Sequence, residues 1–155
     1  MRVSTKEFHV PDPHYVERIR DSFNRQGFMR HIGARIEELG PGRCVIAVDF
    51  REELAQQHGF FHGGLVGALG DNAGAYAAFT LIHANQSMLT VEYKINLVAP
   101  AQGQTLWAVG EVVRAGRALT VCQTRVLAVD DAKEAQLCGL ATVTMMTLTS
   151  RGDKK

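Results

Sequence analysis

The sequence predicts an α+β fold in which a curved antiparallel sheet wraps around one long central helix. One observation is the run of small and apolar residues from 63 to about 83, an apolar helix that needs burial on all sides. The other is the order of elements, since a helix and a hairpin come before this run and three or four β-rich segments come after it. A sheet that curves around the helix is the simplest architecture that buries it.

The segment before the long helix predicts an N-terminal helix and a hairpin. Apolar residues recur at helical spacing up to Gly27, and Asp12 followed by Pro13 is typical of a helix cap and first turn. Residues 32–39 and 44–50 are joined by a turn that contains two glycines, and the second segment alternates along its length. This pattern indicates a pair of antiparallel strands.

The second half of the chain is rich in β-forming residues and turn signals. Long runs separated by turns predict an antiparallel meander. Because no repeat, low-complexity tract or linker occurs, we expect one domain over 1–155, with a helical extension (1–27), a core (28–149) and a tail (150–155). The expected strands span residues 89–97, 105–113, 119–129 and 136–149.

Composition argues against several classes of partner. Hydrophobic residues make up 46% and charged residues 21%, and a net charge of +1 is small for a surface that binds nucleic acid. Cys44, Cys122 and Cys138 show no metal-binding or disulfide spacing, so we expect reduced, buried thiols, no metal site and a cytoplasmic location. We expect no signal peptide in the first seven residues, no membrane span in the polar-interrupted central run, and a solvated end over residues 151–155.

The chain is almost uncharged around the start of the long helix. Between Glu53 and Glu92 lie 38 residues, of which only Asp71 carries a formal charge, whereas a charged content of 21% would give about eight. Burial of an unpaired carboxylate is costly and raises its pKa. Asp71 is therefore the first candidate for a functional residue.

The long helix begins with His62-Gly63-Gly64, which suits an oxyanion. The first amides of a helix lack intrahelical acceptors, and glycines let a ligand approach them closely. Asp71 follows His62 by nine positions, roughly 13 Å of helix, whereas a base acts within about 3 Å of the atom attacked. Two antiparallel copies would bring Asp71 of one helix to the glycines of the other, which suggests a symmetric dimer with two composite sites.

The glycines inside the helix have two explanations. Gly67, Gly70 and Gly74 each cost roughly 1 kcal/mol of helix stability relative to alanine, so a compensating contact is expected. Close packing of a sheet or a second helix, and space for a ligand, are both compatible with this pattern.

Two segments match the sequence patterns of a known family. Residues 62–73, within the run from Gln56 to Asp71, fit the pattern HGG-x-x-x-x-L-x-D-x-A. Residues 89–101 resemble the strand that follows the helix in that family and ends in a Pro-Ala-x-x-Gly turn, for which this chain has Pro100, Ala101 and, one residue closer, Gly103. The chain thus resembles the hotdog-fold acyl-CoA thioesterases, most closely their PaaI-like branch, over roughly residues 28–149. The resemblance implies the hotdog fold and hydrolysis of an acyl-CoA thioester, but no particular acyl group.

The resemblance implies catalytic roles for five residues. Asp71 is expected to be the nucleophile or the base that positions water. Gln56 would face the carbonyl or the water, and its pairing with an aspartate, where many relatives have glutamate, leaves the choice of mechanism open. The Gly63 amide would polarise the thioester carbonyl, His62 would orient neighbouring groups, and Thr90 would lie near the carboxylate.

Five further residues are candidates for substrate binding. Gly64 belongs to the helix start, His58 would contact the substrate or its own loop, and Phe61 would pack in the core or line an acyl pocket. Arg114 and Arg117 flank a glycine turn and would meet the phosphates of coenzyme A, or form a solvated hairpin end. The expected partners are the acyl-CoA and further copies of the chain, as a homodimer and often a dimer of dimers, with no cofactor beyond the coenzyme A of the substrate.

Other functions are weighed against this one. Hydration or dehydration of an acyl thioester usually needs a histidine and a carboxylate in one site, and no such pair can be assigned. A non-catalytic acyl-CoA-binding or sensing module would be expected to carry an output domain. A serine hydrolase is disfavoured because the sequence has no GxSxG motif.

Overall fold

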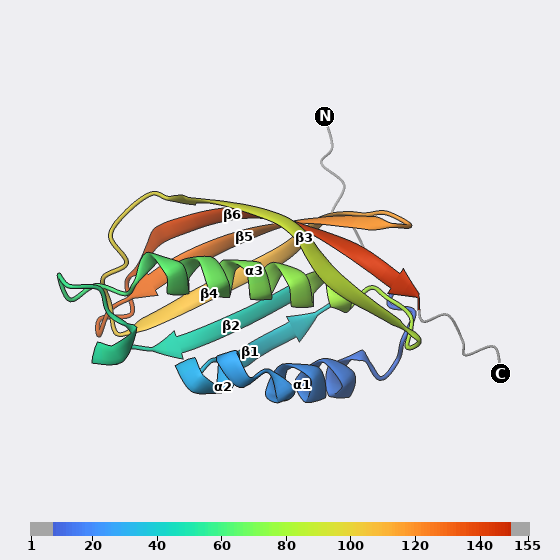
Figure 1. Ribbon diagram of the computed structural model, residues 1–155, viewed down its shortest axis with the longest axis horizontal. Coiled ribbons are helices and arrows are strands. Elements are labelled where there is room, and N and C mark those ends of the chain that lie inside the picture. Colours follow the sequence, from blue (N-terminus) through green and yellow to red (C-terminus); the bar gives the residue numbers. More distant parts are fainter. Residues whose placement is uncertain (1–7, 150–155) are drawn as a thin grey trace.

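A six-stranded antiparallel sheet curves around one long helix, and the predicted fold class is confirmed (Figure 1). The structure is a computed structural model that describes residues 8–149. The predictions for the first seven residues and for the tail, 150–155, lie outside the described residues. In chain order the elements are α1 (Tyr15–Arg25), α2 (Gly27–Ile32), β1 (Arg35–Gly40), β2 (Arg43–Asp49), η1 (Glu52–Leu54), α3 (Gly63–Phe79), β3 (Gln86–Leu97), β4 (Thr105–Ala115), β5 (Leu119–Val129) and β6 (Ala135–Thr149).

The sheet has the strand order β1-β2-β4-β5-β6-β3. The predicted meander is present in β4, β5 and β6, which pair in sequence as antiparallel neighbours. Strand β3 does not pair with β4, which follows it in the chain, but with the last strand, β6. Consequently β1 and β3 form the two edges of the sheet, and β3 lies alongside α3.

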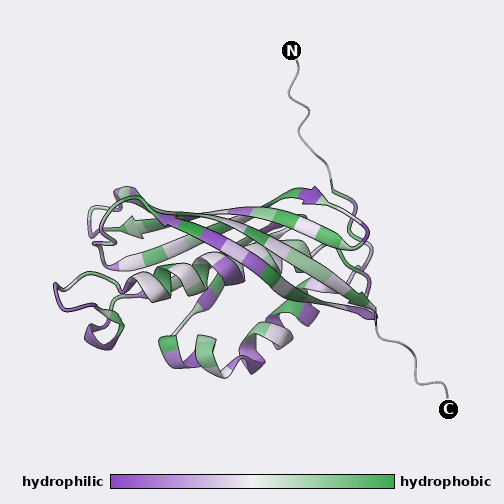
Figure 2. Cartoon of the chain, turned by 45° about the horizontal axis from the view of Figure 1, so that its top comes forward, coloured by the Kyte–Doolittle hydropathy of each residue, from purple (hydrophilic) through white to green (hydrophobic). Residues whose placement is uncertain are grey.

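Close packing against the sheet explains most of the small residues in α3. A Cβ at Gly74 would lie 2.9 Å from a valine side chain of β6, and a Cβ at Gly110 in β4 would overlap the carbonyl of Ala73. The helix therefore touches the sheet with almost no side chain between them. Figure 2 shows α3 coloured white to green along most of its length, as its burial requires. Gly67 differs, because the atom nearest to its Cβ position is the hydroxyl of Tyr93 on the edge strand.

Helix α3 ends at Phe79 rather than near residue 83, where the sequence predicted its end. The reason is the next residue, Thr80, which is fully buried. Its hydroxyl donates to the carbonyl of Ala77 at 2.7 Å and accepts from the amide of Gly42 at 2.8 Å. This tertiary contact fixes the end of α3 against the β1–β2 turn. The hydrophobic periodicity of the sequence cannot predict it, because the two residues are distant in the chain.

The N-terminal helix predicted up to Gly27 is α1, and a second short helix that the sequence did not predict, α2, follows it. Gln26 separates them because its backbone is extended, with φ −71° and ψ 109°. The prediction that Asp12 caps the first helix is wrong, since His14 occupies that position. The Asp12 carboxylate instead accepts a hydrogen bond from the His14 amide and forms a 2.7 Å ion pair with Nε of Arg18.

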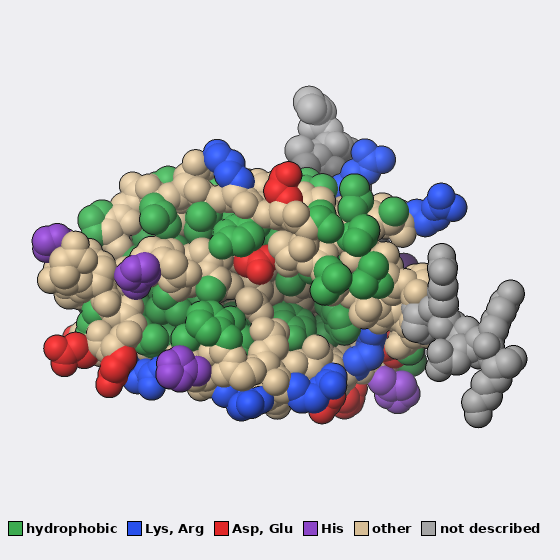
Figure 3. Space-filling model, viewed as in Figure 1, with side chains coloured by type: hydrophobic (Ala, Val, Ile, Leu, Met, Phe, Trp, Pro, Cys, Tyr) green, Lys and Arg blue, Asp and Glu red, His purple; other side chains and the backbone are tan. Residues whose placement is uncertain are grey.

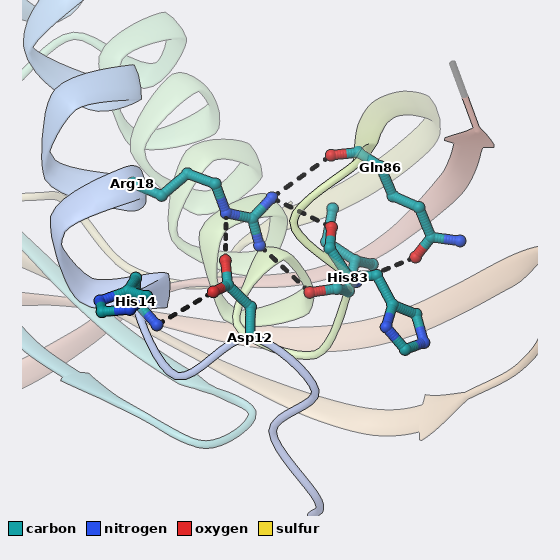
Figure 4. Close-up of polar contacts among 6 residues, drawn as sticks. Asp12, His14, Arg18, His83 and Gln86 are labelled. Atoms are coloured by element: carbon teal, nitrogen blue, oxygen red, sulfur yellow. Dashed lines mark hydrogen bonds and ion pairs between the residues drawn. The ribbon is translucent and has the colours of Figure 1, made fainter. Parts of the chain in front are cut away.

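Arg18 docks α1 against the C-terminal end of α3 (Figure 4). Its guanidinium donates to the main-chain carbonyls of Ile82, His83 and Gln86. Carbonyls at and beyond the end of a helix lack intrahelical partners. Arg18 satisfies three of them while Asp12 balances its charge, and this fixes α1 beside the second half of α3.

The three cysteines are free and buried, as predicted. Burial raises the pKa of the Cys44 thiol to about 12, so this thiol is protonated and unreactive at neutral pH. Among residues 8–149, no helix is long and apolar enough to cross a membrane.

Candidate active site

Asp71 lies in the middle of α3 beside strand β3. Its Oδ1 accepts a 2.9 Å hydrogen bond from the hydroxyl of Thr90. Burial raises the pKa of the Asp71 carboxyl, and the hydrogen bond from Thr90 opposes part of this rise. A partly desolvated carboxylate is a better base than one in water. The structure thus brings Thr90 to the carboxylate, where the resemblance placed it.

A β-bulge turns Thr90 toward the helix. The pairs Tyr93–Val143 and Thr90–Met145 both lie on the side of the sheet that faces α3. They are two residues apart on β6 but three apart on β3, because Val91 is the extra residue of a bulge. In a regular strand Val91 would take the place of Thr90. Bulges commonly re-aim side chains next to active sites in this way.

A cavity of about 290 Å³ opens beside Asp71. It is bounded by the N-terminal helical segment, by the second half of α3, and by β3 and β6. Its apolar wall includes Met88 and Met145, and its polar wall includes Ser22 and Gln26. The carboxylate therefore stands at a space of mixed polarity that suits an organic ligand.

The start of α3 offers one free amide. Nδ1 of His62, the N-cap residue, accepts a 2.9 Å hydrogen bond from the amide of Gly64. This occupies the Gly64 amide, and the predicted role of His62 in orienting catalytic groups stays a prediction. No described residue accepts a hydrogen bond from the Gly63 amide. A free N–H at a helix N-terminus is suited to stabilise an oxyanion.

Gly63 lines a second cavity of about 290 Å³, together with Gln56 and Phe61. The Gln56 side-chain oxygen accepts a hydrogen bond from the amide of His58. Gln56 and His58 therefore also stabilise the loop before α3. Phe61 is 3% exposed, and its ring packs edge-on against Phe50 at 5.1 Å. Phe61 thus belongs to the core and also lines this cavity, and its role in an acyl pocket stays a prediction.

The two cavities are separate within one chain. No described residue lines both the Asp71 cavity and the Gly63 cavity. The eight residues from Gly63 to Asp71 span about 12 Å of helix. The structure therefore groups Asp71 with Thr90, and Gly63 with Gln56 and His62, but it does not bring the two groups together.

Arg114 and Arg117 lie exposed at the β4–β5 hairpin end. This hairpin lies at the Asp71 end of the sheet, because Leu89 of β3 and Leu119 of β5 pair with the same residue of β6. Neither arginine lines either of the two cavities. Their predicted contact with phosphates stays a prediction.

Sequence reasoning missed Tyr93 and a polar cluster at the far side of the Asp71 cavity. Tyr93 lies beside Gly67, and the cluster joins Ser22 and Gln26 to the hydroxyl of Tyr76. The spacing of Ser22 and Gln26 by one helical turn is a signal that could have indicated a shared polar face. Tyr76 gave no such signal, because its partners are distant in the sequence.

Several known proteins are similar to this chain in sequence or fold. Residues 58–135 match the thioesterase superfamily. A thioesterase family protein from Silicibacter pomeroyi is 41% identical, and its crystal structure matches with a TM-score of 0.85 over 87% of this chain and 98% of that chain. The 1,4-dihydroxy-2-naphthoyl-CoA hydrolase of Listeria monocytogenes is 25% identical over 112 residues, which are 72% of this chain and 89% of that protein. The E. coli PaaI protein, at 17% identity, shares the fold with a TM-score of 0.76 over 90% of this chain and 96% of its own.

The fold and these relatives define a thioester hydrolase with the hotdog fold. The chain belongs to the thioesterase superfamily. The predicted resemblance is confirmed at this level.

Proposed function

We propose that the protein hydrolyses an acyl-CoA thioester in a site shared by two copies of the chain. One protomer supplies the Asp71 carboxylate, held by Thr90. The other supplies the amide of Gly63 at the start of its α3. The observation that carries this proposal is the pair of separate cavities, each of which holds one half of the groups that such a reaction needs.

The spacing of residues on α3 supports a two-fold arrangement. Gly67 is midway between Gly63 and Asp71, four residues from each, and Tyr93 of the edge strand lies beside it. A two-fold axis that passes near Gly67 and Tyr93 would set two α3 helices antiparallel, with each Asp71 facing the Gly63 of the other. The absence of a side chain at Gly67 lets Tyr93 of the same chain pack onto the helix at this point.

Strand β3 offers the surface for such a dimer. Its exposed large apolar side chains are Leu89, Val91, Tyr93 and Leu97. A long edge strand carries unpaired main-chain groups that can pair with another strand, and exposed apolar side chains mark a contact surface. Figure 3 shows apolar side chains gathered over α3 and β3, whereas most charged groups lie around the rim of this face.

The shared site would perform hydrolysis by polarising the carbonyl and attacking its carbon. The Gly63 amide and the positive end of the helix would stabilise the oxyanion. Asp71 would attack the carbonyl carbon and form an anhydride that water then hydrolyses, or it would take a proton from an attacking water molecule. In both routes the C–S bond breaks, the thiolate of coenzyme A is protonated, and water supplies the new oxygen of the acid. Gln56 would face the carbonyl or the water, and His62 would hold the helix start.

The remaining parts of the proposal concern the substrate and the assembly. A relative that bears the name of a CoA-thioester hydrolase supports coenzyme A as the thiol. Arg114 and Arg117 would bind its phosphates, and Gly64, His58 and Phe61 would complete the walls of the site. The proposal needs no metal or redox cofactor. It includes pairing of dimers into tetramers and a cytoplasmic location, in keeping with three free thiols.

Release of free thiol from a panel of acyl-CoAs, aliphatic and aryl, short to long, tests this function. We expect turnover by the native protein, and a kcat lower by about 10²–10⁴-fold in Asp71→Asn, which keeps the shape of the side chain but removes the base. Asp21→Asn, which changes a carboxylate that is 71% exposed on α1, is the control and should stay active. Thiol release from none of the acyl-CoAs would favour a binding module, and full activity of Asp71→Asn would refute the role of Asp71.

A further inference from the structure

The N-terminal helical segment forms one wall of the cavity beside Asp71. Ser22 of α1 and Gln26 at its end both line this cavity. Nε2 of Gln26 donates to the Tyr76 hydroxyl at 2.6 Å, and Oγ of Ser22 lies 3.2 Å from the same oxygen. The ring of Phe23 packs edge-on against the Tyr76 ring, with centroids 5.5 Å apart. These contacts form the wall of the cavity beside Tyr76.

The position of this wall corresponds to a definite depth. Tyr76 follows Asp71 by five residues, about 7.5 Å of helix, and Phe79 follows it by eight, about 12 Å. The cavity of about 290 Å³ is roughly twice the volume, about 150 Å³, of a cavity that holds one benzene ring. It has room for a substituted ring or a medium aliphatic chain. A longer group that starts at Asp71 would meet the helical wall.

The wall is held firmly in place. Arg18, which forms an ion pair with the buried Asp12, donates to the carbonyls that follow α3 (Figure 4). Its guanidinium also lies 4.7 Å from the centroid of the Phe79 ring. Four separate contacts, from Arg18, Ser22, Phe23 and Gln26, therefore join this segment to the second half of α3. A wall fixed in this way can exclude a ligand that is too long, because the helix cannot easily move aside.

We propose that α1 is the end wall of the acyl-binding cavity and that Ser22, Gln26 and Tyr76 set the largest acyl group that the enzyme accepts. The inference rests on the proposed function, because it takes the reacting carbonyl to lie at Asp71. An acyl group that reaches past Tyr76 must break the contacts of its hydroxyl and leave a buried polar group unpaired. An apolar pocket discriminates by about tenfold or more for a single methylene that does not fit.

Two substitutions of opposite effect test the inference on a series of straight-chain acyl-CoAs from acetyl upward. Ser22→Phe extends the wall into the cavity, and we expect it to lower kcat/KM for the longest chain that the native protein accepts well, relative to kcat/KM for acetyl-CoA, by about tenfold or more. Gln26→Ala removes part of the wall and should move the preferred chain length upward. Asp21→Phe places the same ring on the neighbouring, solvent-facing position of α1 and should leave the ratio as it is.

The ratio between long and short substrates separates a wall from a merely structural helix. A parallel loss at all chain lengths in Ser22→Phe, or an unchanged chain-length profile in both variants, would overturn the inference. The proposed function would still stand if Asp71→Asn were inactive on every substrate. If Ser22→Phe does not fold, the profile of Gln26→Ala decides, because this change only shortens a side chain. Failure of the native protein to hydrolyse any acyl-CoA would overturn the proposed function and the inference with it.

Discussion

The two edges of the sheet differ in the chemistry of their side chains. Along the β1 edge, Arg35 forms ion pairs of 2.6 and 2.8 Å with Glu37 and Asp49, and Arg43 pairs with Glu38 at 2.9 Å. The β3 edge spans twelve residues and exposes large apolar side chains. Charged side chains discourage an edge strand from pairing with another strand, whereas a long apolar edge favours it. The side chains therefore disfavour pairing of β1 with another strand, whereas those of β3 favour contact with a second copy of the chain.

Both halves of the candidate site lie along β3, and neither lies along β1. Thr90 of β3 holds Asp71, and Leu97 near the end of the strand lies beside Gly63, where a Cβ would be 2.9 Å from its Cδ1. The edge suited to a second copy is thus the edge that carries the functional groups. This coincidence gives a physical reason why one chain holds two incomplete sites.

After the loss in Asp71→Asn, the largest effect is expected from a change at the start of α3 that leaves β3 intact. Gly63→Pro removes the amide proton at the first helical position, where proline fits, and His62 before it already has the extended backbone (ψ 135°) that proline requires. We expect kcat for thiol release to fall by about 10²–10³-fold.

Gly63→Ala is the matched control for this change. It keeps the amide but places a Cβ near Leu97, as proline does. Its kcat should therefore lie well above that of Gly63→Pro. Equal rates for the two variants, with both folded by circular dichroism, would show that bulk and not the lost N–H matters.

A lysine introduced on β3 and one introduced on β1 should have different effects on the dimer. Val91 is 49% exposed on β3, and Val91→Lys would bury two like charges at a two-fold interface, at a cost of several kcal/mol. We expect light scattering to show dissociation of the dimer and thiol release to fall with it. Glu37→Lys on β1 disturbs only a partly exposed ion pair, worth about 1 kcal/mol or less, and should stay dimeric and active. A monomeric Val91→Lys protein with full activity would contradict the assignment of β3.

A smaller effect is expected from the hydrogen bond that β3 gives to Asp71. The reaction needs the charged carboxylate, so activity rises as the pH increases through the pKa of Asp71, which burial has raised. Thr90→Val removes the hydrogen bond that lowers this pKa, and the acid limb of the kcat/KM profile should move to higher pH. Thr90→Ser keeps the hydroxyl and should keep the native profile. If the acid limb of Thr90→Val lies at the same pH as that of the native protein, the limb does not report the ionisation of Asp71.

Much of the fold was predictable, because it follows from local patterns. The scarcity of charge and the glycine-rich start located α3 and Asp71, and alternation with turn signals located the strands. The residues that escaped prediction depend on contacts between distant segments. The end of α3 depends on Thr80 meeting Gly42, and the bulge at Val91 depends on the register of β3 against the last strand.

The candidate site was predictable in its parts but not in their grouping. The resemblance indicated Gly63 and Asp71, and helical rise alone showed that one chain cannot join them. The meeting of Ser22 and Gln26 with Tyr76 could not be predicted, because it joins α1 to α3 across about 50 residues of sequence. Periodicity places residues on faces of one element, but it does not say which faces meet.

Complementation between two inactive variants tests the shared site most directly. Asp71→Asn and Gly63→Pro chains would be unfolded together, refolded as a mixture and assayed for thiol release. Each mixed dimer would contain one site with both defects and one intact site. If both changes are fully inactivating and pairing is random, activity should return to about one quarter of the native value, since about half of the dimers are mixed. A mixture as inactive as its two components, although mixed dimers have formed, would contradict a site built from two chains.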